Sequence, residues 1–302
     1  MKPLSREKSF IYSSILFMLI CAGVIFVHFT NNIPQGTLQS SEQTNNFDSE
    51  DVSADYEPET IEYEDVFGEV EYTNMPEGKS YRSVTKRTVV DTRTGSRLVY
   101  IYPVFSGFGD EEDRSINSII EYQTDKQRKI NAQGYFNLVE SGARVIYEIT
   151  GFSIEYADEK LLSIRFNSFF DVLSDSTHID TGATYFSYSV NLDLTKMDII
   201  ESEQLFSDFL LMGERLKNDK MTLVYGSDDI KNIKPADMLS QYSIKYDIYP
   251  DIYFTKDSVN IIISLTSDLG GYAVFSDNLS DSREYVNQYL LALSLLYNNS
   301  GG

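Results

Sequence analysis

The longest apolar segment of the chain is Phe10–Phe29, twenty residues that include no Lys, Arg, Asp or Glu. At a rise of about 1.5 Å per residue, a helix of this length spans about 30 Å, the thickness of the hydrocarbon core of a bilayer. Three basic residues precede the segment, whereas thirteen acidic residues and no basic residue lie between it and Lys79. Because positive charge is retained on the cytoplasmic side, we predict a single-pass signal-anchor in the cell membrane, with residues 1–9 cytoplasmic and the C-terminal domain extracellular.

A cleaved signal peptide and a lipoprotein leader are the alternatives to an anchor. A signal peptide has a shorter apolar region, followed by a cleavage site with small residues. Here the apolar run continues past Cys21 to Val27, and no such site follows it. Lipoprotein processing at Cys21 would need a small residue before it, where the chain has Ile20. His28 lies at the outer end of the span, where an ionisable side chain can reach the interface; deeper in a span it would be a functional suspect.

Residues 30–79 are rich in Ser, Asn, Gln, Glu and Asp and poor in aliphatic residues. Such a segment cannot bury enough apolar surface to fold alone, so we predict a disordered acidic linker. Repulsion between its like charges should extend it, which suits a spacer between the membrane and a domain. The alternative is that this acidic segment binds a partner, although a run of charged residues is usually only solvated.

Beyond residue 80, apolar residues follow the periods of strands and helices. Alternating aromatic and β-branched residues predict a hairpin, a three-stranded antiparallel meander and a late hairpin. The predicted strands are Tyr81–Val90, Leu98–Phe105, Val145–Tyr156, Leu161–Phe170, Tyr185–Leu194, Tyr253–Phe254 and Val259–Thr266. Apolar residues at helical spacing predict the helices Glu111–Ile130, Glu203–Leu216, a short one from Pro235, and Ser282–Tyr297. The candidate caps are Asp110 or Asp113 for the first helix and a capping box of Asp281 and Glu284 for the last.

These strands and helices come in blocks, without regular βαβ alternation. The order predicts an α+β fold in which mainly antiparallel sheets pack with a few helices, preceded by the transmembrane helix and the linker.

The charge of the chain limits its partners. The formal net charge is −21, and residues 80–302 alone carry 21 Lys and Arg against 32 Asp and Glu, a net of −11. Nucleic acid and anionic membrane surfaces attract cationic proteins, so neither is expected to bind the exterior part. An acidic surface would instead attract a basic partner by electrostatic steering.

Cysteine and aromatic usage narrow the chemistry further. Cys21 is the only cysteine, so disulfides, thiolate catalysis and cysteine zinc sites are excluded outside the membrane. An exterior part without cysteine is more typical of Gram-positive surface proteins than of animal secreted domains. The chain has no Trp but 22 Tyr and 18 Phe, which suit half-buried strands.

Few residues suggest a reaction or a ligand. One segment holds the polar residues Asp175, Ser176, His178 and Asp180. They could form a metal or calcium loop, or a Ser–His–Asp nucleophile, although a triad needs spatial geometry rather than adjacency in the sequence. A solvated loop explains the same residues.

Three further motifs have simpler explanations than a ligand site. The acidic run Asp110–Asp113 lacks calcium-loop spacing and suits a helix N-terminus. Gly270-Gly271 indicates a turn, and the glycosylation patterns at Asn278 and Asn298 are common by chance. No catalytic, cofactor-binding or metal-ligating residue is therefore assigned.

Several short segments, taken in order, resemble two modules of known extracytoplasmic proteins. Tyr102–Gly107 and the following Ile116–Ile120 are similar to the module that precedes the catalytic domain of PdaC-type peptidoglycan deacetylases. Four later segments are similar to the C-terminal module, of unknown function, in the extracytoplasmic region of RsiV-type membrane proteins: Leu161–Phe166, Val190–Thr195, Glu203–Phe206 and Ile252–Val259. The resemblance implies two α+β modules, at residues 80–142 and 143–302.

The chain departs from this family at points that bear on function. The loop 177–183 holds a His and a Gly-Ala pair in a different order from the Gly-Gly-Ala-His of the family, so no role passes to His178. Asp193 keeps its place, but Met197-Asp198 stands where a Gly is expected. Nine cytoplasmic residues are too few for the segment that binds a sigma factor, and we expect no deacetylase domain. What the resemblance implies is a sensor-like ectodomain. In the RsiV case that ectodomain is similar to a receptor for lysozyme, a basic protein, which would be compatible with the acidic surface here.

Two classes of function follow. The first is a non-enzymatic, membrane-anchored binding or sensing domain whose ligand is a basic protein such as lysozyme or a cell-wall glycan such as peptidoglycan. The second is a hydrolase of cell-wall polymers, which would need a pair of carboxylates about 5–10 Å apart in a cleft. A structural envelope scaffold is a third alternative, and none of the three requires a cofactor.

Overall fold

The computed structural model describes residues 66–69, 75–91, 95–140, 144–173, 184–244 and 248–293. All of them belong to one compact unit, Pro58–Gly302. No helix within these ranges is long and apolar enough to cross a membrane. The predicted anchor Phe10–Phe29 lies outside the described residues, so the membrane topology stays a prediction.

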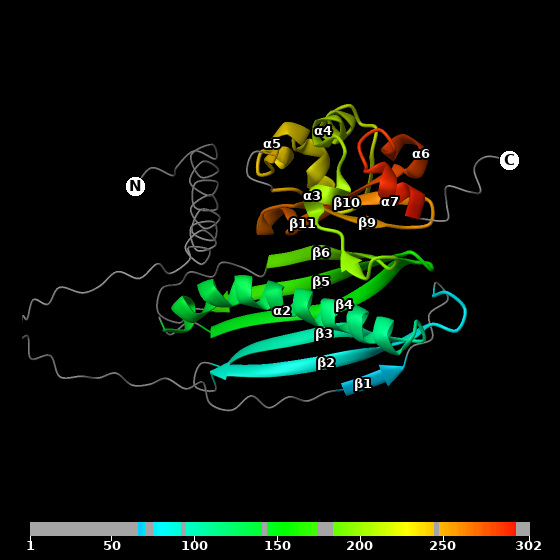
Figure 1. Ribbon diagram of the computed structural model, residues 1–302. Helices are drawn as coiled ribbons and strands as arrows, with labels where there is room; N and C mark the ends of the chain where they lie inside the picture. The colour runs from blue at the N-terminus through cyan, green and yellow to red at the C-terminus, as the bar shows by residue number, and fades with distance from the viewer. Residues whose placement is uncertain are drawn as a thin grey trace, which may run out of the picture. The chain divides into compact units, whose positions relative to one another are not determined.

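The larger of two sheets contains seven strands, which lie side by side in the order in which they occur along the chain (Figure 1). They are β1 (Val66–Glu69), β2 (Ser80–Asp91), β3 (Ser96–Ser106), β4 (Arg144–Ala157), β5 (Leu161–Leu173), β6 (Thr184–Asp193) and β7 (Asp198–Ile199). The antiparallel pairs β2–β3, β4–β5 and β5–β6 confirm the predicted hairpin and meander.

One pairing in this sheet differs from the antiparallel expectation, because β3 and β4 are parallel. Parallel neighbours need a long crossover connection, and helix α2 (Asp110–Glu140) supplies it between them. The helix ends ten residues beyond its predicted end at Ile130. The resulting βαβ unit joins strands from both predicted modules, 80–142 and 143–302, in one sheet; the boundary itself stays a prediction.

Helix α2 covers one face of the large sheet (Figure 1). Its apolar side chains Ile116 and Ile120 are fully buried, in the same cluster as Ile164 and Phe166 of β5. Since side chains alternate along a strand, the even-numbered residues of β5 face α2 and its odd-numbered residues face away from it.

The start of α2 is fixed to the end of β3 by two side chains. The carboxylate of Asp113 accepts hydrogen bonds from the backbone N–H groups of Gly107 and Phe108, each at 3.0 Å. Asn117 exchanges two hydrogen bonds with the backbone of Phe105, at 2.7 and 2.9 Å. Asp113 therefore holds the turn before the helix rather than capping the helix itself.

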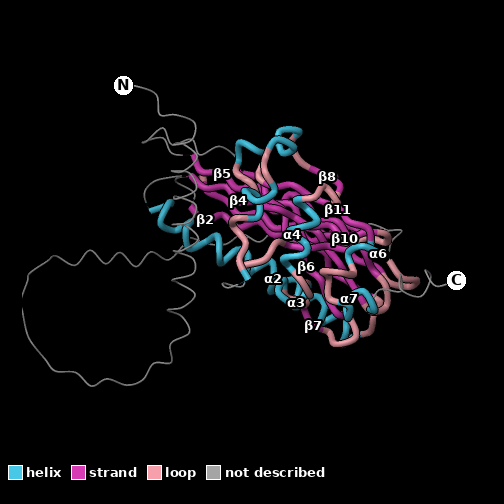
Figure 2. Tube along the Cα trace, turned by 90° about the horizontal axis from the view of Figure 1, so that it is seen from above, coloured by secondary structure: helices cyan, strands magenta, loops and turns pink. Residues whose placement is uncertain are grey.

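The second sheet has four antiparallel strands in the order β8-β11-β10-β9. They are β8 (Thr222–Tyr225), β9 (Asp251–Phe254), β10 (Ser258–Ser264) and β11 (Tyr272–Asn278). The hairpin β9–β10 was predicted, whereas β8 and β11 were not. Several short helices cover the outer face of this sheet (Figure 2). Ile261 and Ile263 of β10 lie in one hydrophobic cluster with residues of these helices. The helices are α3 (Ser202–Leu205), α4 (Phe209–Lys217), α5 (Pro235–Leu239), α6 (Leu279–Ser282) and α7 (Gln288–Leu293).

The helix predicted at Glu203–Leu216 is wrong as a single helix, because the chain forms α3 and α4 instead. Phe206 leaves the helical path to make an isolated bridge with Val286. Asp208 then starts α4, since its carboxylate accepts the N–H of Leu211 at 2.9 Å.

The helix predicted at Ser282–Tyr297 is also interrupted, because α6 ends at Ser282 and α7 begins only at Gln288. Val286, between them, is the partner of the bridge to Phe206. The predicted capping box of Asp281 is wrong as well: Asn278 caps α6, and its side-chain oxygen accepts the N–H of Asp281 at 2.9 Å.

Strand β1 lies within the range predicted as a disordered linker, residues 30–79. Val66–Glu69 pairs antiparallel with Arg82–Thr85 of β2, so pairing begins before residue 80. Val66 and Phe67 are residue types that favour strands, and the outer edge of β2 is available to them.

Candidate functional site

The two sheets meet where β9 lies beside β5 and β6 (Figure 1). Ser189 Oγ and Asn191 Nδ2 both donate to the backbone carbonyl of Ile252, each at 2.6 Å. Ser163 Oγ donates to Asn191 Oδ1 at 2.7 Å and accepts the N–H of Phe254 at 3.0 Å. Three of these four bonds join the large sheet to β9, and the bond between Ser163 and Asn191 orients two of the side chains that make them. Together they fix where β9 sits on the odd-numbered face of β5.

The odd-numbered face of β5 also carries an ion pair between Arg165 and Glu155. The guanidinium of Arg165 lies over the ring of Tyr253, 5.2 Å from its centroid, and Arg165 pairs with Glu155 at 3.0 Å. Glu155 also accepts a hydrogen bond from Ser153 Oγ at 2.6 Å. The charge of Arg165 is thus balanced within the junction, and its guanidinium packs on an aromatic face.

Phe169, Tyr185, Tyr225 and Tyr272 form what we call the aromatic patch at this junction. Tyr185 packs on Phe169 with ring centroids 5.4 Å apart, and Tyr225 stacks on Tyr272 at 4.7 Å. Tyr185 and Tyr225 are 51% and 48% exposed, whereas Tyr272 is buried. The hydroxyl of Tyr272 donates to Asn167 Oδ1 at 3.3 Å, and Asn167 shares a face of β5 with Phe169, so the two ring pairs are linked.

A β-bulge directs Tyr225 toward this patch. Leu223 and Tyr225 pair with consecutive residues of β11, so Val224 is an extra residue in β8. Leu223 packs among the helices on the outer face of the small sheet, whereas Tyr225 stacks on Tyr272. Without the bulge, strand alternation would put both side chains on one face.

The turn between β10 and β11 lies directly against β6. Gly271 has a φ of +84°, and a Cβ on it would stand 1.8 Å from the backbone oxygen of Tyr185. Its carbonyl accepts the N–H of Leu265 at 2.7 Å, and its own N–H donates to Thr266 at 3.1 Å. The turn predicted at Gly270-Gly271 is confirmed, and Gly271 is the residue that permits its close approach to the patch.

Asp251, the first residue of β9, is the carboxylate at the junction with a strongly shifted pKa. The residue is half-buried where β9 packs against β5 and β6. Burial raises the pKa of Asp251 to about 7, because the ionised form loses hydration, and a hydrogen bond from the Ser189 backbone lowers it in part.

We expect Asp251→Asn to stabilise the protein at pH 8, by at most about 4 kcal/mol, and to have little effect near pH 4. The raised pKa means that the stability contributed by protonated Asp251 is present below its ordinary pKa and is lost as the pH rises through about 7. Urea unfolding of both proteins between pH 4 and 9 measures the difference. Asp268→Asn, on an exposed turn of the same sheet, controls for the loss of one negative charge. A difference that does not depend on pH would contradict this prediction.

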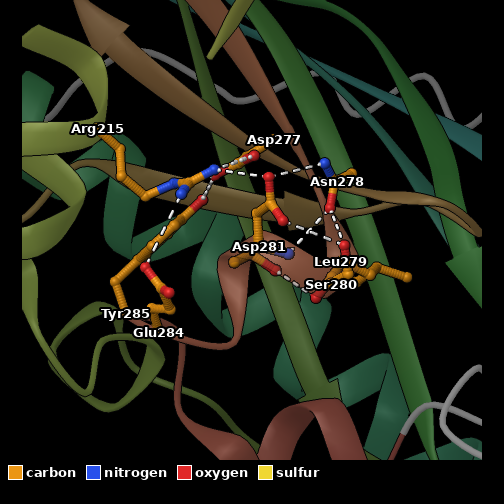
Figure 3. Close-up of polar contacts among 9 residues, drawn as sticks. Arg215, Asp277, Asn278, Leu279, Ser280, Asp281, Glu284 and Tyr285 are labelled. Carbon is orange, nitrogen blue, oxygen red and sulfur yellow. Dashed lines mark hydrogen bonds and ion pairs between the residues drawn. The ribbon is translucent and has the colours of Figure 1, made fainter. Parts of the chain in front are cut away.

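The densest charged cluster lies between α4, β11 and α6 (Figure 3). Arg215 makes a bidentate pair with Asp277, at 2.7 and 3.0 Å, and a third bond to Asp281 at 3.1 Å. Tyr285 donates its hydroxyl to Asp277 Oδ2 at 3.2 Å. The Asp277 side chain is only 1% exposed, and it faces a cation and a hydroxyl that satisfy it. We interpret this cluster as structural, since it fastens the helices to the small sheet.

The structure tests only some of the residues considered from sequence. Asp175, Ser176, His178, Asp180 and Asn298 lie outside the described residues. The acidic run Asp110–Asp113 forms the first turn of α2. The side chain of Asn278 caps α6, as Figure 3 shows. Within the described ranges, no group of three or more His, Asp or Glu side chains is arranged to hold a metal ion.

The aromatic patch was not predicted from sequence. Its members come from β5, β6, β8 and β11, and two of these strands were unrecognised. The only sequence signal was the high tyrosine content, which strands explain equally well.

Comparison with known proteins finds no family model and no curated protein that matches this chain. Similarity is found to solved structures of the DUF3298 family. A member from Bacteroides fragilis has a TM-score of 0.40 and 14% identity, covering 75% of this chain and 94% of that one. A DUF3298 family protein from Pseudomonas aeruginosa PAO1 has a TM-score of 0.38 and 9% identity, covering 76% and 96%.

Proposed function

We propose that this chain is a non-enzymatic binding or sensing domain, held on the outer side of a cell membrane by its N-terminal segment. Its ligand in this proposal is a cell-wall glycan or a basic protein such as lysozyme. The observation that supports it is the aromatic patch, which presents two half-exposed tyrosine rings, each packed against a second aromatic ring. Rings that are already ordered lose little conformational freedom when a ligand binds, which is the property of a preorganised binding surface.

The charge of the domain supports the protein ligand as an alternative to the glycan. With a net charge of −11 over residues 80–302, the domain would attract a basic protein at a distance, and the attraction would weaken as salt screens it. A glycan held by ring stacking would not show that salt dependence. The salt dependence of binding therefore distinguishes a glycan ligand from a basic protein ligand.

The test is retention of the purified full chain, in mild detergent, on insoluble peptidoglycan and on immobilised lysozyme. We expect retention on at least one support at low salt, and none of an unrelated acidic protein in the same detergent. Repeating the measurement at about 500 mM salt should release the chain from lysozyme but not from peptidoglycan. Failure to bind either support at low salt would rule out both ligands.

A further inference from the structure

We propose that Tyr185 and Tyr225, backed by Phe169 and Tyr272, form the contact surface for an uncharged glycan chain. This inference rests on the proposed binding function and deepens it, because it assigns the site and selects one of the two ligands. The occupant is a run of neutral sugar rings that lies across the sheet junction and contacts both exposed tyrosines.

The geometry of the rings suits sugar stacking. An aromatic ring has a negative face, and the C–H groups on one side of a sugar ring carry a small positive charge. Tyr225 is held parallel to Tyr272, with 16° between the ring planes, so one of its faces is supported while 48% of the residue remains accessible. Tyr185 also contacts an aromatic neighbour, Phe169, but with the two ring planes tilted by 56° rather than stacked. Tyr185 also offers a hydroxyl to the hydroxyl groups of a sugar, whereas the hydroxyl of Tyr225 also interacts with Tyr272.

The charges of the site favour a neutral ligand over a charged one. None of the four rings carries a charge at neutral pH, and the nearby Arg165 is paired with Glu155 at 3.0 Å. A basic segment would seek free carboxylates, which the patch itself does not contribute. An anionic polymer would be repelled by the acidic domain around it. A basic ligand would be attracted by the domain as a whole but finds no carboxylate among the four rings, whereas an uncharged ring-shaped ligand needs none.

The support beneath the patch ties binding to the sheet junction. Tyr272 donates to Asn167 of β5, and Gly271 brings the turn of the small sheet against Tyr185 of β6. The two exposed rings therefore belong to different sheets, and their spacing is set by the junction contacts. An oligosaccharide that contacts both exposed tyrosine rings would bind more tightly than a single sugar, because one molecule engages two contact points.

The experiment is calorimetric titration of the full chain in detergent with a six-residue oligosaccharide of N-acetylglucosamine, which is uncharged. We expect Tyr185→Ala and Tyr225→Ala each to weaken binding by about five- to tenfold, and the double variant to abolish measurable binding. Tyr185→Phe and Tyr225→Phe keep the rings and should stay within about threefold of the natural chain. Tyr122→Ala is the matched control, because Tyr122 is 61% exposed but lies on α2.

Each outcome separates this inference from the proposed function. If the natural chain binds peptidoglycan and the double alanine variant binds it equally, the patch is not the site, although the binding function stands. If the chain binds lysozyme alone, the glycan assignment is overturned. If oligosaccharide binding is lost between about 50 and 500 mM salt, the ligand contact is electrostatic and the uncharged mode is wrong. If nothing binds, the proposed function itself fails.

Discussion

Replacing Arg215 with methionine is expected to destabilise the fold by about 3–5 kcal/mol. Methionine preserves much of the packing volume but leaves the Asp277 carboxylate, 1% exposed, without the cation that compensates for its lost hydration. Tyr285 would still donate one hydrogen bond, which cannot replace a bidentate charged pair. Urea unfolding of the full chain in detergent, followed by circular dichroism, measures the loss.

Two controls separate the buried charge from the loss of an arginine as such. Glu284→Gln removes a partner that is 62% exposed and 3.9 Å from Arg215, and should change stability by less than about 0.5 kcal/mol. Combining Arg215→Met with Asp277→Asn should recover part of the loss, because the uncompensated charge is gone. A cost below about 1 kcal/mol for Arg215→Met alone would show that the pair does not hold the small sheet to its helices.

Replacing Gly271 with alanine should be about as damaging, at about 3 kcal/mol or more. The new Cβ would collide with the backbone oxygen of Tyr185, so either β6 or the turn between β10 and β11 must move. The positive φ of +84° adds a smaller penalty, because side-chain-bearing residues avoid the left-handed region. Unfolding free energy and binding to peptidoglycan should both fall, since the moved turn carries the base of the aromatic patch.

Gly270 supplies the matched control for this collision. It has a φ of +91°, but no atom lies within 4 Å of where its Cβ would be. Gly270→Ala should therefore cost only the conformational penalty, about 1 kcal/mol. Equal effects of the two substitutions would show that close approach to Tyr185 is not what Gly271 provides.

The local elements of this fold could be read from the sequence, while those set by distant contacts could not. The strands of the meander carry mostly apolar residues on the face covered by α2 and more polar residues on the face toward β9, so their period is visible. β11 is buried on both faces over Ala273 and Val274, and its continuous apolar run has no period. The two helix interruptions were invisible for another reason, since the bridge between Phe206 and Val286 joins residues 80 positions apart.

The candidate site was less predictable than the fold because its parts meet only after both sheets form. Tyr225 reaches the patch through a bulge, and nothing in the sequence Thr222–Tyr225 marks Val224 as an extra residue. Tyr185 and Tyr272 are separated by most of the C-terminal part of the chain. Gly271 was visible as a turn, but its contact with Tyr185 depends on the sheet junction.

Strand β1 would have a mechanical consequence under the proposed attachment of the domain to a membrane by its N-terminal segment. It is held on one side only, by four residue pairs with β2, whereas β2 itself makes eleven pairs with β3. A pulling load entering from the N-terminal segment acts on β1 first, so β1 would peel away while the rest of the sheet stays intact. Separation of β1 from β2 would lengthen the segment between the proposed anchor and the sheet. Under such a load, the edge strand would unfold first and lengthen the N-terminal tether before any force reaches the sheet junction.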